Sequence, residues 1–146
     1  MRFMMLMIPN VYQGKTGANT GANFTPPADA VERMTKYNAE LAKANALISL
    51  DGLHPPTSAA RISFSNGKAN VTDGPFIESK ETLGGYWMID VKSREEAVEW
   101  ARRVPADEGD VIEIRQVFEM SDFPEDVKKA AENPIVDAWA EQNRKQ

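Results

Sequence analysis

The sequence contains no cysteine and a single histidine, His54. Without cysteine there are no disulfide bonds, thiolate metal sites or cysteine nucleophiles. With one imidazole as well, we expect no tight metal site, and we expect the protein to act without a cofactor. The sequence also lacks the G-x-G-x-x-G, G-x-S-x-G and H-E-x-x-H motifs, so dinucleotide-binding, serine-hydrolase and zinc-protease sites are unsupported.

Excess positive charge and long apolar runs are also missing. The 17 basic residues are scattered and the net charge is −5, so nucleic acid is not an expected partner. No segment approaches the roughly 20 apolar residues that span a bilayer. The apolar run at 3–8 is too short for a signal peptide. We therefore expect a cytoplasmic protein that does not contact a membrane.

The first half of the chain predicts a strand, a loop and a helix. In the strand at 3–8 both alternating sets of side chains are apolar, which is typical of a strand covered on both faces. Residues 10–25 are rich in Gly and Asn and lack periodicity, so we predict a long loop. A helix is then predicted with Thr25 as its N-cap and Pro26 at its first position.

The second half predicts a hairpin and a second strand-helix-strand unit. A strand ends near Asp51-Gly52, and Asn66-Gly67 indicates the two-residue turn of a hairpin. A strand at 86–91 is followed by a helix that begins with the capping box of Ser93 and Glu96. The last core strand is predicted at 111–118.

This order predicts an α+β domain over residues 1–118, a ferredoxin-like βαββαβ fold with an inserted β-hairpin. Two helices cover one sheet face, so we expect the other face to pack against a second subunit in a homodimer. Residues 119–146 form a predicted C-terminal helical extension, broken at Asn133-Pro134. Its apolar patch needs a surface, either the core of its own chain or the partner subunit.

The segment 72–87 contains a rigid turn, several ionisable groups and a predicted strand that begins after two glycines. Asp73-Gly74-Pro75-Phe76 is typical of a turn, and any loop could use these residues in that way. Several carboxylates and a lysine follow closely, however, and a carboxylate held on a rigid turn beside a pocket can transfer protons or orient a ligand. Asp73 is therefore the candidate general acid–base.

Other candidates lie near this segment or on the last strand. Lys80, Glu78 and Tyr86 are candidate substrate-binding residues in the same stretch. Arg115 lies two residues from Glu113 on one strand face, where it forms an ion pair or binds an anionic ligand. His54 is a weaker catalytic candidate, because it can equally be a solvent-exposed loop histidine that is held by the two following prolines and has no function.

The stretch T-D-G-P-F-x-E-x-K-E-x-x-G-G-Y at 72–86 resembles the signature of the DGPF branch of the YCII-related proteins. The resemblance implies a bacterial protein with the dimeric α/β barrel arrangement, in which two ferredoxin-like sheets pack face to face. It also implies a His-Asp pair with the histidine on the first helix. Residues 34–40 of that helix contain no histidine, so only Asp73 is carried over.

Three functions remain open from the sequence. The first is a cofactor-independent small-molecule enzyme with lyase, isomerase or dehydrochlorinase chemistry, by analogy of fold. The second is a non-catalytic ligand-binding or regulatory module that uses the same pocket. The third is a structural interaction protein that docks through Ile135 and Trp139 of the extension.

Overall fold

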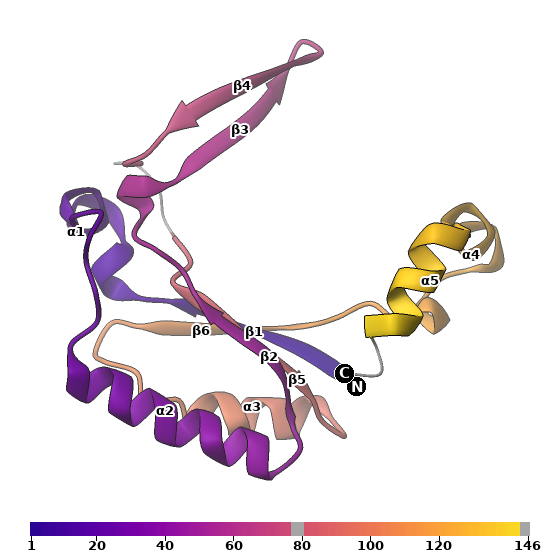
Figure 1. Ribbon diagram of the computed structural model, residues 1–146, viewed down its shortest axis with the longest axis horizontal. Helices are drawn as coiled ribbons and strands as arrows, with labels where there is room; N and C mark the ends of the chain where they lie inside the picture. Colours follow the sequence, from indigo (N-terminus) through magenta and orange to yellow (C-terminus); the bar gives the residue numbers. More distant parts are fainter. Residues whose placement is uncertain (77–80, 144–146) are drawn as a thin grey trace.

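The computed structural model describes residues 1–76 and 81–143. Its main sheet is antiparallel with strand order β2-β5-β1-β6, which confirms the ferredoxin-like arrangement (Figure 1). The central strand β1 pairs with β5 on one side and with β6 on the other. The four strands are β1 (Arg2–Ile8), β2 (Leu47–Gly52), β5 (Gly85–Asp90) and β6 (Val111–Gln116).

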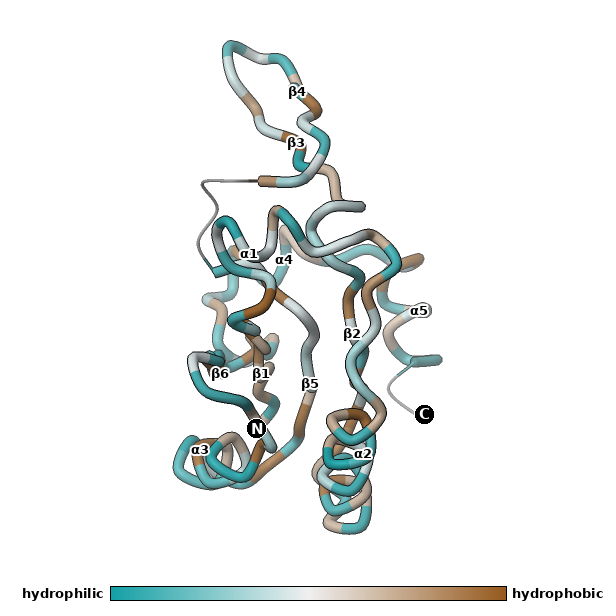
Figure 2. The backbone as a smooth tube through the Cα atoms, turned by 90° about the vertical axis from the view of Figure 1, so that its left-hand side faces the viewer, coloured by the Kyte–Doolittle hydropathy of each residue, from teal (hydrophilic) through white to brown (hydrophobic). Residues whose placement is uncertain are grey.

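Two helices, α2 (Ala28–Lys43) and α3 (Arg94–Arg102), cover one face of this sheet (Figures 1 and 2). Tyr37 joins them, because its hydroxyl donates to the carbonyl of Trp100 at 2.9 Å and its ring meets the Trp100 ring edge-on. The core between helices and sheet consists of Phe3, Met5, Tyr37, Leu41, Ala46, Trp87, Ile89, Val91, Ala97, Trp100 and Val104.

Local sequence signals fix several element boundaries. Ser93 Oγ accepts a hydrogen bond from the Glu96 amide at 3.1 Å and so caps α3. Asn66 and Gly67 have φ values of 51° and 71°, the left-handed conformation that a two-residue hairpin turn requires. This turn joins β3 (Ala60–Ser65) to β4 (Lys68–Asp73), a separate two-stranded sheet.

Two local predictions at the N-terminal end of α2 need correction. The helix begins at Ala28, with Pro27 in the N-cap position, because Pro27 forces the preceding Pro26 into an extended conformation. Residues 10–25 are not an irregular loop: they contain a 3-10 turn at Asn10–Tyr12 and a short helix, α1 (Gly14–Asn19). Tertiary contacts order this segment, and local periodicity does not reveal them.

Two arms project from the domain on the side of the sheet away from α2 and α3 (Figure 1). One is the β3–β4 hairpin, and the other is the extension with α4 (Glu125–Ala131) and α5 (Pro134–Asn143). The extension does not bury its apolar patch on its own core, because Ile135 and Trp139 remain 81% and 64% exposed. Within residues 1–76 and 81–143, no helix is long and apolar enough to cross a membrane.

Candidate functional site

A cavity of about 690 Å³ lies beside α2, at the end of the sheet where β1 and β2 finish and β5 begins. The segment before α2 and the loop that follows α3 complete its walls. This volume falls within the range of sites that hold drug-sized ligands, about 300–1,000 Å³. The sheet end therefore offers room for a small molecule.

The inner wall of the cavity is apolar and carries one internal hydrogen bond. Met34, Leu50 and the indole of Trp87 contribute to this wall. Trp87 is buried, and its Nε1 donates to Asn38 Oδ1 on α2 at 2.8 Å. This bond fixes the orientation of the Asn38 amide, so Nδ2 is the end of that side chain left to donate.

The outer wall of the cavity is formed by residues 10–25, the segment that was predicted from the sequence to be a loop. Gln13 ties it to the loop before β5 through two 2.8 Å hydrogen bonds with the backbone of Thr82, 69 residues away. Tyr12 donates to the carbonyl of Leu53 at 3.1 Å and packs edge-on against Phe24. Burial raises the pKa of Tyr12 above its ordinary value, so its hydroxyl stays protonated near neutral pH.

Carboxylates line the rim of the cavity. Asp110 accepts hydrogen bonds from the amides of Asn10 and Asp107, both at 2.8 Å. Asp51 accepts from the Tyr86 hydroxyl at 2.9 Å. Among the described residues that line the cavity there is no Lys, Arg or His, so the rim has a negative electrostatic potential. The described residues also contain no cluster of three His, Cys, Asp or Glu side chains suited to a metal ion.

Gly84 and Gly85 make this geometry possible by allowing close packing within the chain. A Cβ on Gly84 would lie 2.5 Å from Pro9 Cγ, and one on Gly85 would lie 2.8 Å from the carbonyl oxygen of Asp51. The missing side chains therefore admit a proline ring and a neighbouring strand.

The YCII-related domain model matches residues 1–121 of the chain. The chain belongs to the YCII-related family. An uncharacterised protein of Rhizobium meliloti is 48% identical over 50 residues, which cover 34% of this chain and 40% of that protein. The match therefore spans less than half the length of this relative.

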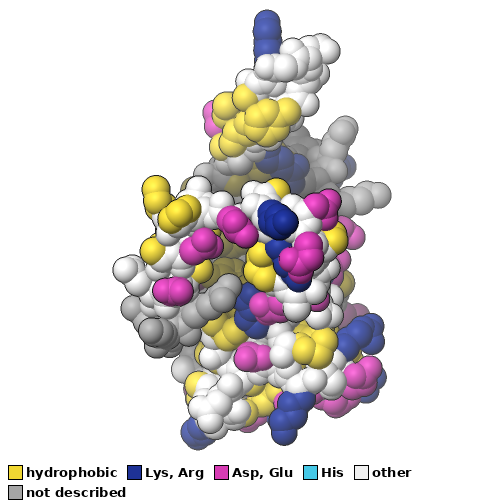
Figure 3. Space-filling model, turned by 90° about the vertical axis from the view of Figure 1, so that its right-hand side faces the viewer, with side chains coloured by type: hydrophobic (Ala, Val, Ile, Leu, Met, Phe, Trp, Pro, Cys, Tyr) yellow, Lys and Arg dark blue, Asp and Glu magenta, His cyan; other side chains and the backbone are white. Residues whose placement is uncertain are grey.

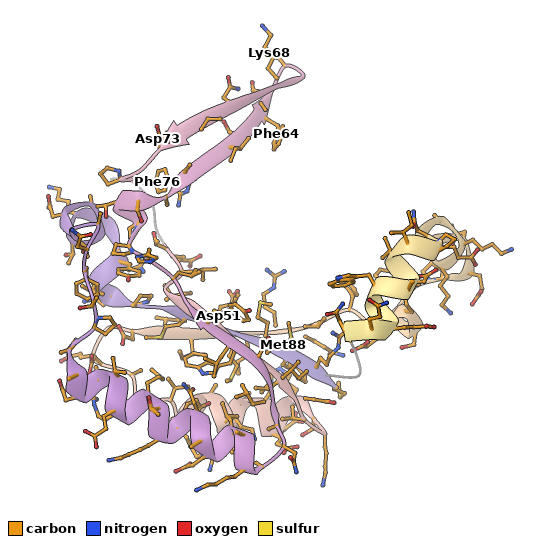
Figure 4. All side chains as sticks on the ribbon, in the orientation of Figure 1. Asp51, Phe64, Lys68, Asp73, Phe76 and Met88 are labelled. Carbon is orange, nitrogen blue, oxygen red and sulfur yellow. The ribbon has the colours of Figure 1, made fainter. Side chains whose placement is uncertain are left out.

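In this member of the YCII-related family, Asp73 lies at the end of β4, exposed and at the base of the hairpin, apart from Asp51 on β2 (Figure 4). It lines neither the large cavity nor the smaller one described below. The next residue, Gly74, donates its amide to the carbonyl of Ala59 at 2.7 Å and lies against the Pro56 carbonyl, where a Cβ would clash. The acid–base role of Asp73 stays a prediction, and the turn has an evident structural role.

The other predicted site residues are dispersed. His54 lines a second cavity of about 280 Å³, together with Arg61 and Phe76, whose ring lies 4.0 Å from the Arg61 guanidinium carbon. Tyr86 lines the large cavity, whereas Arg115 is exposed on the edge strand β6. Glu78 and Lys80 lie outside the described residues.

Sequence reasoning missed the roles of Asn38 and Asp110. A signal for Asn38 existed, because the YCII resemblance drew attention to residues 34–40, the part of the first helix where a histidine was expected. Met34, Thr35 and Asn38 of this stretch line the cavity. No comparable sequence signal existed for Asp110, because a loop carboxylate that lines a cavity looks the same in sequence as one that is exposed to solvent.

Proposed function

We propose that this YCII-related protein binds a small, uncharged and mainly apolar molecule in the cavity beside α2. The observation that carries the proposal is the cavity itself: about 690 Å³, with an apolar inner wall and the Trp87–Asn38 hydrogen bond within it. Ligand sites typically combine such an apolar surface with a few oriented polar groups. Asn38 Nδ2 would supply one donor to the ligand.

The charge of the rim supports the choice of an uncharged ligand. Asp51, Asp107 and Asp110 all line the cavity, and a bound anion would be repelled by them. Arg33 reduces this potential only in part, through a 3.4 Å contact with Asp107 on the exposed side. We therefore expect carboxylate and phosphate compounds to bind more weakly than neutral compounds of the same shape.

A thermal-unfolding screen tests the proposal. The probes are uncharged aromatic and aliphatic fragments, each paired with a carboxylate analogue of similar size. A neutral fragment present at a hundred times its Kd should stabilise the folded protein by about 2.7 kcal/mol. Its carboxylate analogue should stabilise the protein less at the same concentration.

Two variants localise the binding. Met34→Trp places a larger side chain on the cavity wall and should abolish the stabilisation. Met120→Trp makes the same change on the surface after β6 and should leave it intact. Equal stabilisation of Met34→Trp and the unaltered protein would contradict the proposal, and so would a preference for the carboxylate analogues.

A further inference from the structure

The second cavity, of about 280 Å³, lies at the base of the hairpin. Its walls come from the loop after β2, the start of β3, Phe76 and the loop before β5. None of the described residues that line it also lines the large cavity beside α2. Its volume is just below the range of sites that hold drug-sized ligands. The second cavity is therefore a separate space that suits a molecule of about the size of a single amino acid.

Arg61 presents the edge of its guanidinium group at this cavity. The guanidinium carbon lies over the Phe76 ring, 4.0 Å from the ring centre, a contact in which the flat face of the group meets the ring. The N–H donors lie in the plane of the group, and within the described residues they form no hydrogen bond or ion pair. A planar fork of free donors matches the two oxygens of a carboxylate.

The register of the hairpin explains why Arg61, and not Asp73, reaches the second cavity. Arg61 pairs with Thr72, whereas Asp73 pairs with Ala60. Successive residues of a strand point to opposite sides, so Asp73 shares the apolar side of the hairpin with Ile62. That side is visible in Figure 3. Arg61 lies on the other side of the hairpin, and this places its positive charge at the cavity without a neighbouring Asp73 carboxylate.

Glu81 brings a negative charge to the same cavity on a constrained backbone. Its φ value is 62°, the left-handed conformation that few residues other than Gly, Asn and Asp adopt. The two hydrogen bonds between Gln13 and the backbone of Thr82 hold the next residue in place. Conformations of this kind cluster at ligand sites. In the part of the chain that the structure describes, Glu81 and Arg61 form no ion pair with each other, so both charges are left for a ligand.

An imidazole and two leucines complete the wall. His54 lies between Leu53, whose carbonyl accepts the hydrogen bond from Tyr12, and the fully buried Pro55. Its ring can donate a hydrogen bond to a carboxylate in either protonation state. Leu53 and Leu83 line the cavity and remain 47% and 37% exposed. An apolar group in the cavity would remove this leucine surface from water.

We propose that the second cavity binds an α-amino acid with an apolar side chain. Arg61 pairs with the carboxylate of the ligand, Glu81 pairs with its ammonium group, and the two leucines contact its side chain. A simple carboxylate leaves Glu81 unpaired and is repelled by it, and a simple amine meets the same obstacle at Arg61. This site does not depend on the apolar-ligand site proposed beside α2.

Isothermal titration calorimetry with three matched probes tests the proposal. The probes are L-leucine, isocaproate, which lacks the amino group, and isoamylamine, which lacks the carboxylate. L-Leucine should bind at least about tenfold more tightly than either analogue, because each analogue leaves one charge of the site unpaired. Equal affinities for the three probes would overturn the proposal. So would the absence of saturable L-leucine binding at millimolar concentration.

Variants of the two charged residues test their separate roles. Arg61→Ala and Glu81→Gln should each weaken L-leucine binding at least about tenfold. Glu81→Gln should leave isocaproate binding at least as tight as before, because it removes only a repulsive charge, whereas a merely structural defect would weaken both probes. Lys68→Ala removes a positive charge from the far end of the same hairpin (Figure 4) and should change the affinity less than about twofold. Circular dichroism verifies that each variant is folded.

One further variant separates this site from the large cavity. Met34→Trp fills the space beside α2 and should bind L-leucine as the unaltered protein does. If Met34→Trp abolishes L-leucine binding while Arg61→Ala retains it, the amino acid binds in the large cavity and the proposal is wrong. Failure of the neutral fragments to bind beside α2 would leave the expected L-leucine results unchanged.

Discussion

The cavity beside α2 takes its walls from positions between Met7 and Asp110, whereas the turn at Asp73–Phe76 is made of four consecutive residues. Two of the side chains that line the cavity, Trp87 and Asn38, hydrogen-bond to each other across the fold although they are 49 residues apart in the chain. The turn lies at the base of a projecting hairpin, with Asp73 exposed. A conspicuous contiguous motif can thus be needed for a turn, while a binding cavity is assembled from inconspicuous, distant residues.

Truncating one aromatic side chain in each of the two regions should give the largest difference between them. Trp87→Ala should lower the free energy of unfolding by about 3–5 kcal/mol, the usual cost of removing a buried aromatic side chain. Phe76→Ala should cost about 1 kcal/mol, because its ring is half-buried and contacts the Arg61 guanidinium. Urea unfolding followed by circular dichroism measures both. Equal losses would mean that the turn region is as much a part of the core as the cavity wall.

A smaller effect distinguishes the polar groups of the two regions. Asn38→Ala leaves Trp87 Nε1 without its acceptor and should cost about 1–3 kcal/mol of stability. Asp73→Asn changes an exposed side chain and should shift stability by less than about 0.5 kcal/mol. Both values come from the same urea titration. A large loss in Asp73→Asn would reveal that this carboxylate supports the fold.

The smallest expected effect is a pH dependence confined to the helix side of the sheet. Burial raises the pKa of Tyr37 well above its ordinary value of about 10. Above pH 10 the unfolded chain therefore loses a proton that the folded chain retains, and stability falls as the pH rises. Tyr37→Phe should lessen this decline by up to about 1.4 kcal/mol per pH unit. An identical alkaline slope in both proteins would contradict the assignment.

The sequence predicted the elements whose signals are local. Asn66-Gly67 placed the hairpin turn, Ser93 placed the start of α3, and Asn133-Pro134 placed the break between α4 and α5. It did not predict the ordered turn and helix within residues 10–25. The hydrogen bonds that Gln13 and Tyr12 form there join the segment to Thr82 and Leu53, which are far away in the chain.

The candidate site was less predictable for a related reason. A spacing pattern can reveal a motif such as the one around Asp73, but not a cavity whose lining residues meet only when the sheet forms. Tyr86 is the predicted site residue that the described structure places on the large cavity. The better indication of the site was the histidine that the family resemblance places on the first helix, because Met34 and Asn38 from that part of the helix line the cavity.

An NMR titration of ¹⁵N-labelled protein with the tightest neutral fragment from the screen tests the proposed binding site most directly. The three tryptophans give three indole N–H signals, and Trp87 lines the cavity whereas Trp139 lies on the projecting extension. The Trp87 indole signal should shift with saturation, while the Trp139 indole and Gly74 amide signals stay in place. A saturating shift at Gly74 with an unmoved Trp87 signal would place the ligand at the turn and would rule out binding in the cavity beside α2.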